Sequence, residues 1–206
     1  MRLTIESGLQ PEEQMSTDYY DRSGARFFAD SAYADLSQTY TRFLAHVPRG
    51  GAILDAGCGS GRDALAFHRA GYAVTAFDGS ARMVELATAH SGLPVHHLRF
   101  EDVAWEDAFD GIWSCASLLH VPRADLERVM FRLARAAKPG GVWFMSFKHG
   151  ETERFANERH FTDMTPQMLE PLLIQIGLVP RDLWIGDDAR PGRTGERWTN
   201  AIARKP

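Results

Sequence analysis

Short apolar runs alternate with amphipathic stretches along most of the chain. Seven runs have the length and composition of strands, at residues 51–57, 72–78, 95–100, 111–121, 142–148, 178–186 and 196–205. Apolar residues recur at helical spacing in four intervening stretches, at residues 62–70, 80–90, 123–137 and 165–177. This alternation predicts an α/β protein with a doubly wound, mostly parallel seven-stranded sheet and an antiparallel C-terminal strand.

Residues 18–47 precede this pattern and are rich in aromatic side chains. Apolar residues recur there at helical spacing, which predicts one or two helices ahead of the sheet. Ser80 has the position and the side chain of a helix N-cap, and Gly71 follows a helical stretch as a stop signal.

Composition narrows the possible partners. The 206 residues carry a formal net charge of -4, so no overall basic field favours nucleic acid, and a small-molecule substrate fits more easily. Cys58 and Cys115 lack the spacing and histidine partners of a zinc site. No run of eighteen apolar residues and no apolar N-terminal core occur, so we expect a cytoplasmic protein without a membrane span.

The most informative segment, "ILDAGCGSG", joins the first predicted strand to the first predicted helix. Gly57, Gly59 and Gly61 fall in the turn where open parallel sheets bind ligands, and Asp78 ends the next strand. An acidic residue there can accept hydrogen bonds from ribose hydroxyls. The dinucleotide fingerprint requires a glycine where Arg62 stands, so the spacing argues against NAD.

These residues resemble the class I S-adenosylmethionine-dependent methyltransferases. The resemblance is carried by "ILDAGCGSG", "AFDGS", "FED", "FDGIWSCASLLHV" and "KPGG", between residues 51 and 148. "GCGSGRDA", "SLLHVP" and "RPGRTGERWTN" are most similar to small bacterial tellurite-resistance-like methyltransferases. The resemblance implies a Rossmann-like methyltransferase fold in one domain, with an N-terminal helical cap (1–49), a cofactor-binding core (50–148) and a C-terminal substrate-side segment (149–206).

The resemblance also implies a site for S-adenosyl-L-methionine. Its expected cofactor-binding residues are Tyr20, Asp55, Ala56, Gly57, Gly59, Gly61, Arg62, Asp78, Gly79, Ser80, Met83, Glu101, Asp102, Val103 and Ser117. Several have alternatives that stay open here. Met83 fits a core position, the acidic loop around Asp102 fits a solvated surface, and Arg62 could bind loop carbonyls. Tyr20, favoured over Tyr19 as a lid residue, could equally be core.

His120 is the candidate catalytic residue, because an imidazole with a pKa near 6.5 suits proton removal at neutral pH. A histidine that only begins a helix is the alternative. Methyl transfer from a sulfonium mainly requires alignment, so a base is needed only when the acceptor must lose a proton. The basic residues of the C-terminal third predict either an anionic-substrate site or a salt-bridged surface; they are Lys148, Arg154, Arg159, Arg190, Arg193 and Arg197.

The function expected from the sequence is methyl transfer to a small-molecule acceptor. A methyltransferase acting on tRNA or protein is the nearest alternative, suggested by the arginine-rich C-terminal third. A non-catalytic S-adenosylmethionine-binding module and a dehydrogenase are the others. The sequence identifies neither the acceptor nor the oligomeric state.

Overall fold

The computed structural model describes residues 11–190 and 192–206, and its largest feature is a seven-stranded sheet. Residues 1–10 of the expected N-terminal cap lie outside the described residues. The strand order is β3-β2-β1-β4-β5-β9-β8. The strands are β1 (Ala52–Ala56), β2 (Ala73–Asp78), β3 (Val95–His97), β4 (Phe109–Ser114), β5 (Ala137–Lys148), β8 (Val179–Asp187) and β9 (Arg197–Arg204).

Strand directions follow the sequence prediction. β1 pairs in parallel with β2 and β4, β2 with β3, and β4 with β5, whereas β9 runs antiparallel to both β5 and β8. The doubly wound sheet with an antiparallel C-terminal strand is therefore confirmed. Several boundaries differ. The strand predicted at 111–121 ends at Ser114, and the one predicted at 95–100 ends at His97. "KPGG" belongs to the start of β5, next to a shift of register between Phe109 and Gly111.

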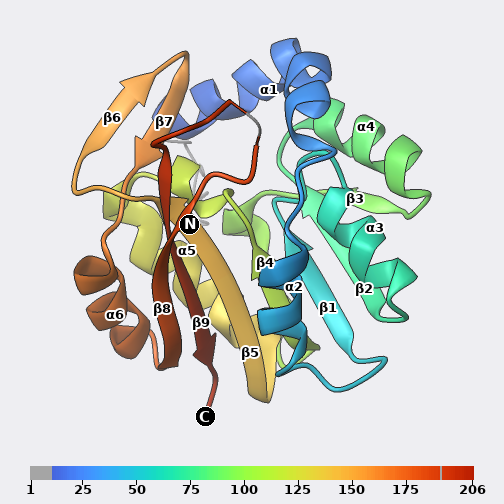
Figure 1. Cartoon of the computed structure of the whole chain (residues 1–206), viewed down its shortest axis with the longest axis vertical. Helices are drawn as coiled ribbons and strands as arrows, with labels where there is room; N and C mark the ends of the chain where they lie inside the picture. Colours follow the sequence, from blue (N-terminus) through green and yellow to red (C-terminus); the bar gives the residue numbers. More distant parts are fainter. Residues whose placement is uncertain (1–10, 191) are drawn as a thin grey trace, which may run out of the picture.

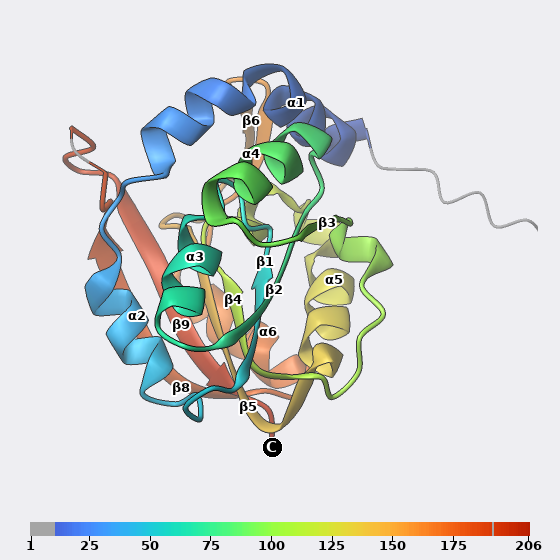
Figure 2. The ribbon, with the colours of Figure 1, turned by 90° about the vertical axis from the view of Figure 1, so that its right-hand side faces the viewer.

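Helices cover both faces of the sheet (Figures 1 and 2). They are α1 (Pro11–Ser31), α2 (Ser37–Leu44), α3 (Arg62–Arg69), α4 (Ala81–Ser91), α5 (Arg123–Ala136) and α6 (Pro166–Gln175). Two short 3₁₀ turns, η1 (Phe100–Asp102) and η2 (Leu118–His120), follow β3 and β4. The two helices expected ahead of the sheet are α1 and α2, and α1 lies across the end of the molecule toward which β1 points.

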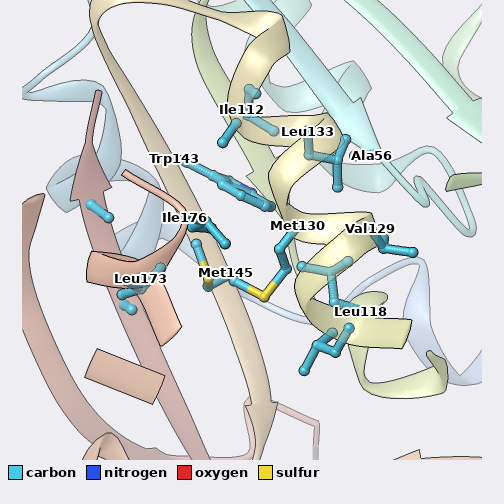
Figure 3. Close-up of a cluster of buried hydrophobic side chains, with 14 of the residues drawn as sticks. Ala56, Ile112, Leu118, Val129, Met130, Leu133, Trp143, Met145, Leu173 and Ile176 are labelled. Atoms are coloured by element: carbon cyan, nitrogen blue, oxygen red, sulfur yellow. The ribbon is translucent and has the colours of Figure 1, made fainter. Parts of the chain in front are cut away.

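Alternating side chains of the central strands build a core on each face. Ile112 and Trp143 pack with α5 and α6 on one face, as Figure 3 shows, while their chain neighbours Trp113 and Phe144 pack with α2 and α3 on the other. The centroids of the Trp113 and Phe144 rings are 4.0 Å apart in a stacked arrangement. Because both faces are buried, the central strands read as continuous apolar runs.

A hairpin that the sequence analysis did not anticipate stands beside α1. It consists of β6 (Glu153–Ala156) and β7 (Arg159–Thr162), joined through Asn157 and Glu158, which both have positive φ. A two-residue hairpin turn usually contains glycine, and this one has none, so the common signal is missing. No helix within residues 11–190 and 192–206 is both long and apolar enough to cross a membrane.

Candidate active site

A cavity of about 1040 Å³ opens where β1, β2 and β4 end, beneath α1 and the β6–β7 hairpin. Eleven of the residues expected from the sequence line it: Tyr20, Gly57, Gly59, Arg62, Asp78, Gly79, Ser80, Met83, Glu101, Ser117 and His120. Five others lie outside its lining: Asp55, Ala56, Gly61, Asp102 and Val103. The structure thus gathers residues from five separate segments of the chain around one space.

The glycine loop packs closely against its neighbours at the edge of the cavity. Gly57 has φ +76°, and a Cβ there would come within 2.5 Å of the Cβ of Ser117. The Ser117 hydroxyl donates a 2.8 Å hydrogen bond to the carbonyl oxygen of Ala56, which fixes the turn after β4 against the turn after β1. Gly61 has φ +72°, and its missing Cβ lets α3 approach Ala87 of α4. Gly57 therefore lets the turn after β4 pack directly on the turn after β1, whereas Gly61 serves helix packing.

The carboxylate of Asp78 joins two loops at the end of β2. Its oxygens accept hydrogen bonds from the backbone N–H groups of Gly59 and Ser80, both at 2.9 Å. Burial raises the pKa of Asp78, and these two hydrogen bonds partly offset that effect. A carboxylate has about four lone-pair sites, so two remain for hydroxyl groups of a ligand in the cavity. Ser80 caps α4 as expected, with its hydroxyl accepting from the N–H of Met83 at 3.2 Å.

Arg62 takes part in a buried polar network beneath the cavity. Its guanidinium binds both oxygens of Asp63, at 2.6 and 2.9 Å, and donates to the carbonyl of Ser31. Asp63 also accepts from Tyr40 at 2.5 Å and from Trp113 at 2.8 Å. Burial alone would raise the pKa of Asp63, but Arg62 and these hydrogen bonds bring it below its usual value. Arg62 was expected either to bind the cofactor or to bind loop carbonyls. In the structure its guanidinium binds groups of the protein itself.

Asp55 lies buried under the glycine loop, 1% exposed, and its Oδ2 atom has no hydrogen-bond partner among the described residues. Burial and then the nearby Asp63 carboxylate raise the pKa of Asp55 well above its usual value.

Met83 is buried, with 1% of its surface exposed, and it also lines the cavity wall. It therefore combines the core position and the cavity position that the sequence left as alternatives. Asp102 is exposed.

His120 and Tyr20 form a hydrogen-bonded pair that also lines the cavity. The Nδ1 atom of His120 lies 2.7 Å from the carbonyl oxygen of His160, so Nδ1 carries the proton. Nε2 is then the acceptor and receives the Tyr20 hydroxyl at 2.8 Å. Burial lowers the pKa of His120 to about 4 and raises that of Tyr20 to about 12. At neutral pH the imidazole is uncharged, and its acceptor nitrogen is already occupied.

The low pKa of His120 makes a prediction for acid stability. Between the ordinary value of 6.5 and about 4, the unfolded chain binds a proton that the folded protein rejects, so stability falls as pH falls. From about pH 7.5 to pH 5, the wild type should lose about 2 kcal/mol more unfolding free energy than His120→Asn. Urea unfolding at both pH values measures this. His68→Asn, at an exposed histidine, is the control; an equal acid loss in His120→Asn and wild type would contradict the assignment.

Sequence reasoning missed several features of this site. It did not foresee that Tyr40 and Trp113 would meet at Asp63, since the three lie on separate elements. It also missed that the β6–β7 hairpin forms a wall of the cavity, although Arg159 was among the candidate basic residues. The available signal was Asn157, a residue type that tolerates positive φ in turns.

Comparison with known proteins agrees with this geometry. Residues 53–141 match a family model described as a methyltransferase domain. The ubiquinone biosynthesis O-methyltransferase of Xanthomonas axonopodis pv. citri is 35% identical over 116 residues, which cover 53% of this chain and 48% of that protein. The chain spans about half the length of the curated relatives it matches.

Solved structures show the same fold. The 1,6-didemethyltoxoflavin-N1-methyltransferase of Burkholderia thailandensis, solved with 1,6-didemethyltoxoflavin and S-adenosylhomocysteine, has a TM-score of 0.78 and 22% identity, covering 98% of this chain and 93% of that one. A TehB-like methyltransferase of Corynebacterium glutamicum has a TM-score of 0.66 and 20% identity, covering 92% and 98%. The fold is the Rossmann-like methyltransferase fold. Together with the family model and the relatives, it supports a class I S-adenosylmethionine-dependent methyltransferase.

Proposed function

We propose that the protein transfers a methyl group from S-adenosyl-L-methionine to a small-molecule acceptor. The observation that carries this proposal is the single cavity that joins the glycine loop and Asp78 to the Tyr20–His120 pair. About 1040 Å³ is at the upper end of ordinary small-molecule sites, which fits two ligands side by side. Two free cysteines, Cys58 and Cys115, fit the reducing cytoplasmic compartment that we also propose.

The residues present fit S-adenosylmethionine. Gly57 and Gly59 line the cavity without Cβ atoms, so backbone is what the loop presents there, and Asp78 retains acceptor sites for the ribose hydroxyls. Phe100 and Met83 supply apolar walls for the adenine. When bound, the cofactor supplies a methyl group on a positively charged sulfur, which leaves as a neutral thioether. We assign cofactor binding to the predicted residues that line the cavity, except Arg62, which binds within the protein, and His120, and we assign support of the glycine loop to Asp55 and Ala56.

The chain's own contribution to chemistry is alignment and a proton path. We propose that α1 (Pro11–Ser31) closes over the cavity as a cap, while the C-terminal segment provides the acceptor side. An acceptor that must lose a proton gives it to the hydroxyl oxygen of Tyr20, as the Tyr20 proton moves to Nε2 of His120. His120 Nδ1 keeps its hydrogen bond to the His160 carbonyl throughout. The low pKa of His120 keeps the receiving nitrogen unprotonated at neutral pH.

Tyr20→Phe tests this path. Loss of the hydroxyl should lower kcat about 10²–10⁴-fold, the usual range for general acid–base catalysis, while affinity for S-adenosylhomocysteine stays within a few-fold. Tyr33→Phe, at a side chain that is 80% exposed, is the matched control. An unchanged kcat in Tyr20→Phe would contradict a proton path through Tyr20. Alignment of the reactants would then be the chain's only contribution to the reaction.

The function itself is tested by mass spectrometry of S-adenosylhomocysteine formed from S-adenosylmethionine. Phenols, heteroaromatic N–H compounds, thiols and total tRNA serve as acceptors in separate reactions. We expect formation with at least one small molecule and none with tRNA. Formation with tRNA alone would contradict the small-molecule proposal. Binding of the cofactor without turnover across the whole panel would favour a non-catalytic module.

A further inference from the structure

The acceptor side of the cavity carries many basic side chains, but most are neutralised within the protein. Lys148 and Arg190 pair with Asp188, Lys148 and Arg193 pair with Glu196, and Arg154 pairs with Asp163. Asp188 also accepts from the indole N–H of Trp198 at 3.0 Å. The sequence predicted either an anionic-substrate site or a salt-bridged surface. The structure shows these four basic residues in salt bridges. They hold the loop after β8 in place and leave little charge for a ligand.

Arg159 on β7 is different. Within residues 11–190 and 192–206 it makes no ion pair with a carboxylate. Aromatic rings surround it instead: its guanidinium carbon lies 4.5 Å from the ring centroid of Tyr19, 5.1 Å from that of Phe161 and 5.8 Å from that of Tyr20. The side chain is half-buried and lines the cavity. A guanidinium in such a place keeps its full positive charge toward any ligand that reaches it.

The hydrogen bonds of Arg159 are also incomplete. Nη1 donates to the Tyr20 hydroxyl oxygen at 3.3 Å, whereas Nε is buried with no hydrogen-bond partner among the described residues. Leaving a buried N–H of a charged group without an acceptor is costly. Nη2 likewise makes no hydrogen bond among the described residues, so Nε and Nη2 are left for acceptor oxygens supplied from the cavity.

Arg159 lies beside the Tyr20–His120 pair, where the proposed proton transfer takes place. Its Nη1 contacts the same hydroxyl that donates to Nε2 of His120, and the ring of Phe161 lies 5.2 Å from the ring of His120. Phe27 stands edge-on to Tyr20, with ring centroids 4.9 Å apart. A ligand group beside Tyr20 would thus meet one uncompensated guanidinium and several aromatic surfaces at once.

We propose that Arg159 is the anion anchor of the acceptor site and that the acceptor is a planar aromatic compound bearing a carboxylate. This inference rests on the proposed function, since it names the substrate class of that same cavity. A carboxylate matches the guanidinium fork in geometry as well as charge. A planar ring packs on Phe161 and Tyr20, which places a neighbouring hydroxyl or N–H of the acceptor against the Tyr20 oxygen.

Arg197 is the rival anchor, because it too lines the cavity and forms no ion pair within the described part of the chain. Its side chain is exposed, on β9, and it is not held against aromatic rings. An exposed arginine in water gains little from one carboxylate, whereas a half-buried one beside aromatic walls gains more. If Arg159 is the anchor, replacing Arg159 should abolish the preference for an anionic ligand and replacing Arg197 should not. If Arg197 is the anchor, the reverse should hold.

The test measures binding rather than turnover. The protein saturated with S-adenosylhomocysteine is titrated calorimetrically with benzoate, salicylate and 2-naphthoate, and with the neutral amide of each. We expect the wild type to bind at least one carboxylate about tenfold or more tightly than its amide. Arg159→Gln should abolish that preference, whereas Arg197→Gln should retain it. Affinity for S-adenosylhomocysteine should remain within twofold in both variants, which reports an intact fold and cofactor site.

Other outcomes would overturn the inference. These are equal binding of each carboxylate and its amide by wild type, no binding of any carboxylate, or a preference that survives in Arg159→Gln. Loss of the preference in Arg197→Gln alone would transfer the anchor to Arg197. Failure of the wild type to bind S-adenosylhomocysteine would instead contradict the proposed function, and this first titration is independent of the carboxylate series.

Discussion

Gly57→Ala should lose most of its affinity for S-adenosylhomocysteine and part of its stability. The added Cβ would lie 2.5 Å from the Cβ of Ser117, a residue held in place by its hydrogen bond to the carbonyl of Ala56. Relief requires the turn after β1 and the turn after β4 to move apart, and both turns line the cavity. We expect binding to weaken by at least about tenfold, equivalent to about 1.4 kcal/mol, as measured by calorimetry.

Gly92→Ala is the matched control for Gly57→Ala. Gly92 has φ +71°, close to the +76° of Gly57, but a Cβ there would meet nothing within 4 Å. In both variants a left-handed backbone with a Cβ should lower the free energy of unfolding by about 1–2 kcal/mol. Only Gly57→Ala should lose about 1–3 kcal/mol more through overpacking. Comparable stability and comparable cofactor binding in the two variants would show that the loop adapts and that Gly57 does not shape the cavity.

Asp63→Asn should strongly destabilise the protein. Asp63 is the only carboxylate that contacts Arg62 among the described residues, and their side chains are 7% and 18% exposed. Removing its charge leaves a buried guanidinium without a counter-ion and weakens the hydrogen bonds from Tyr40 and Trp113. Breaking such a pair costs about 3–5 kcal/mol, so urea unfolding should show a loss of that order.

Asp182→Asn provides the control for Asp63→Asn. Asp182 pairs with Arg42 at 3.5 Å, and both side chains are about half exposed, at 46% and 51%. An exposed ion pair contributes about 0–1 kcal/mol, so this variant should unfold almost like wild type. Equal losses of unfolding free energy in Asp63→Asn and Asp182→Asn would contradict this account. They would show that the buried network does not hold α2 and α3 against β4.

The sequence was sufficient for the sheet, because hydrophobic periodicity is set by local residues. The strand order around β1 follows from four strand–helix repeats and from the glycine loop that ends β1. Ser80 was recognisable as a cap from its own neighbourhood. Asp78 and Gly57 were placed at the cavity because turns after neighbouring parallel strands meet at one edge of the sheet.

Features that depend on contacts across long stretches of chain could not be predicted in this way. The bond between Tyr20 and His120 spans 100 residues, and that between Arg159 and Tyr20 spans 139. Periodicity says that Tyr20 is on a helix but not which residue its hydroxyl reaches. It likewise treats Arg159 as one of six similar basic residues, and only the positions of Asp163, Asp188 and Glu196 separate it from the four that are paired.

The measurement that most directly tests the central claim is calorimetric titration of S-adenosylhomocysteine into wild type, Asp78→Asn and Asp107→Asn. Asp107 is an exposed carboxylate paired with Lys205, so Asp107→Asn controls for the loss of one charge. We predict micromolar binding by wild type and Asp107→Asn, and at least about tenfold weaker binding by Asp78→Asn, since two charge-assisted contacts to the ribose are lost. Absence of binding by wild type, or equal binding by all three proteins, would contradict a cofactor site at the end of β2.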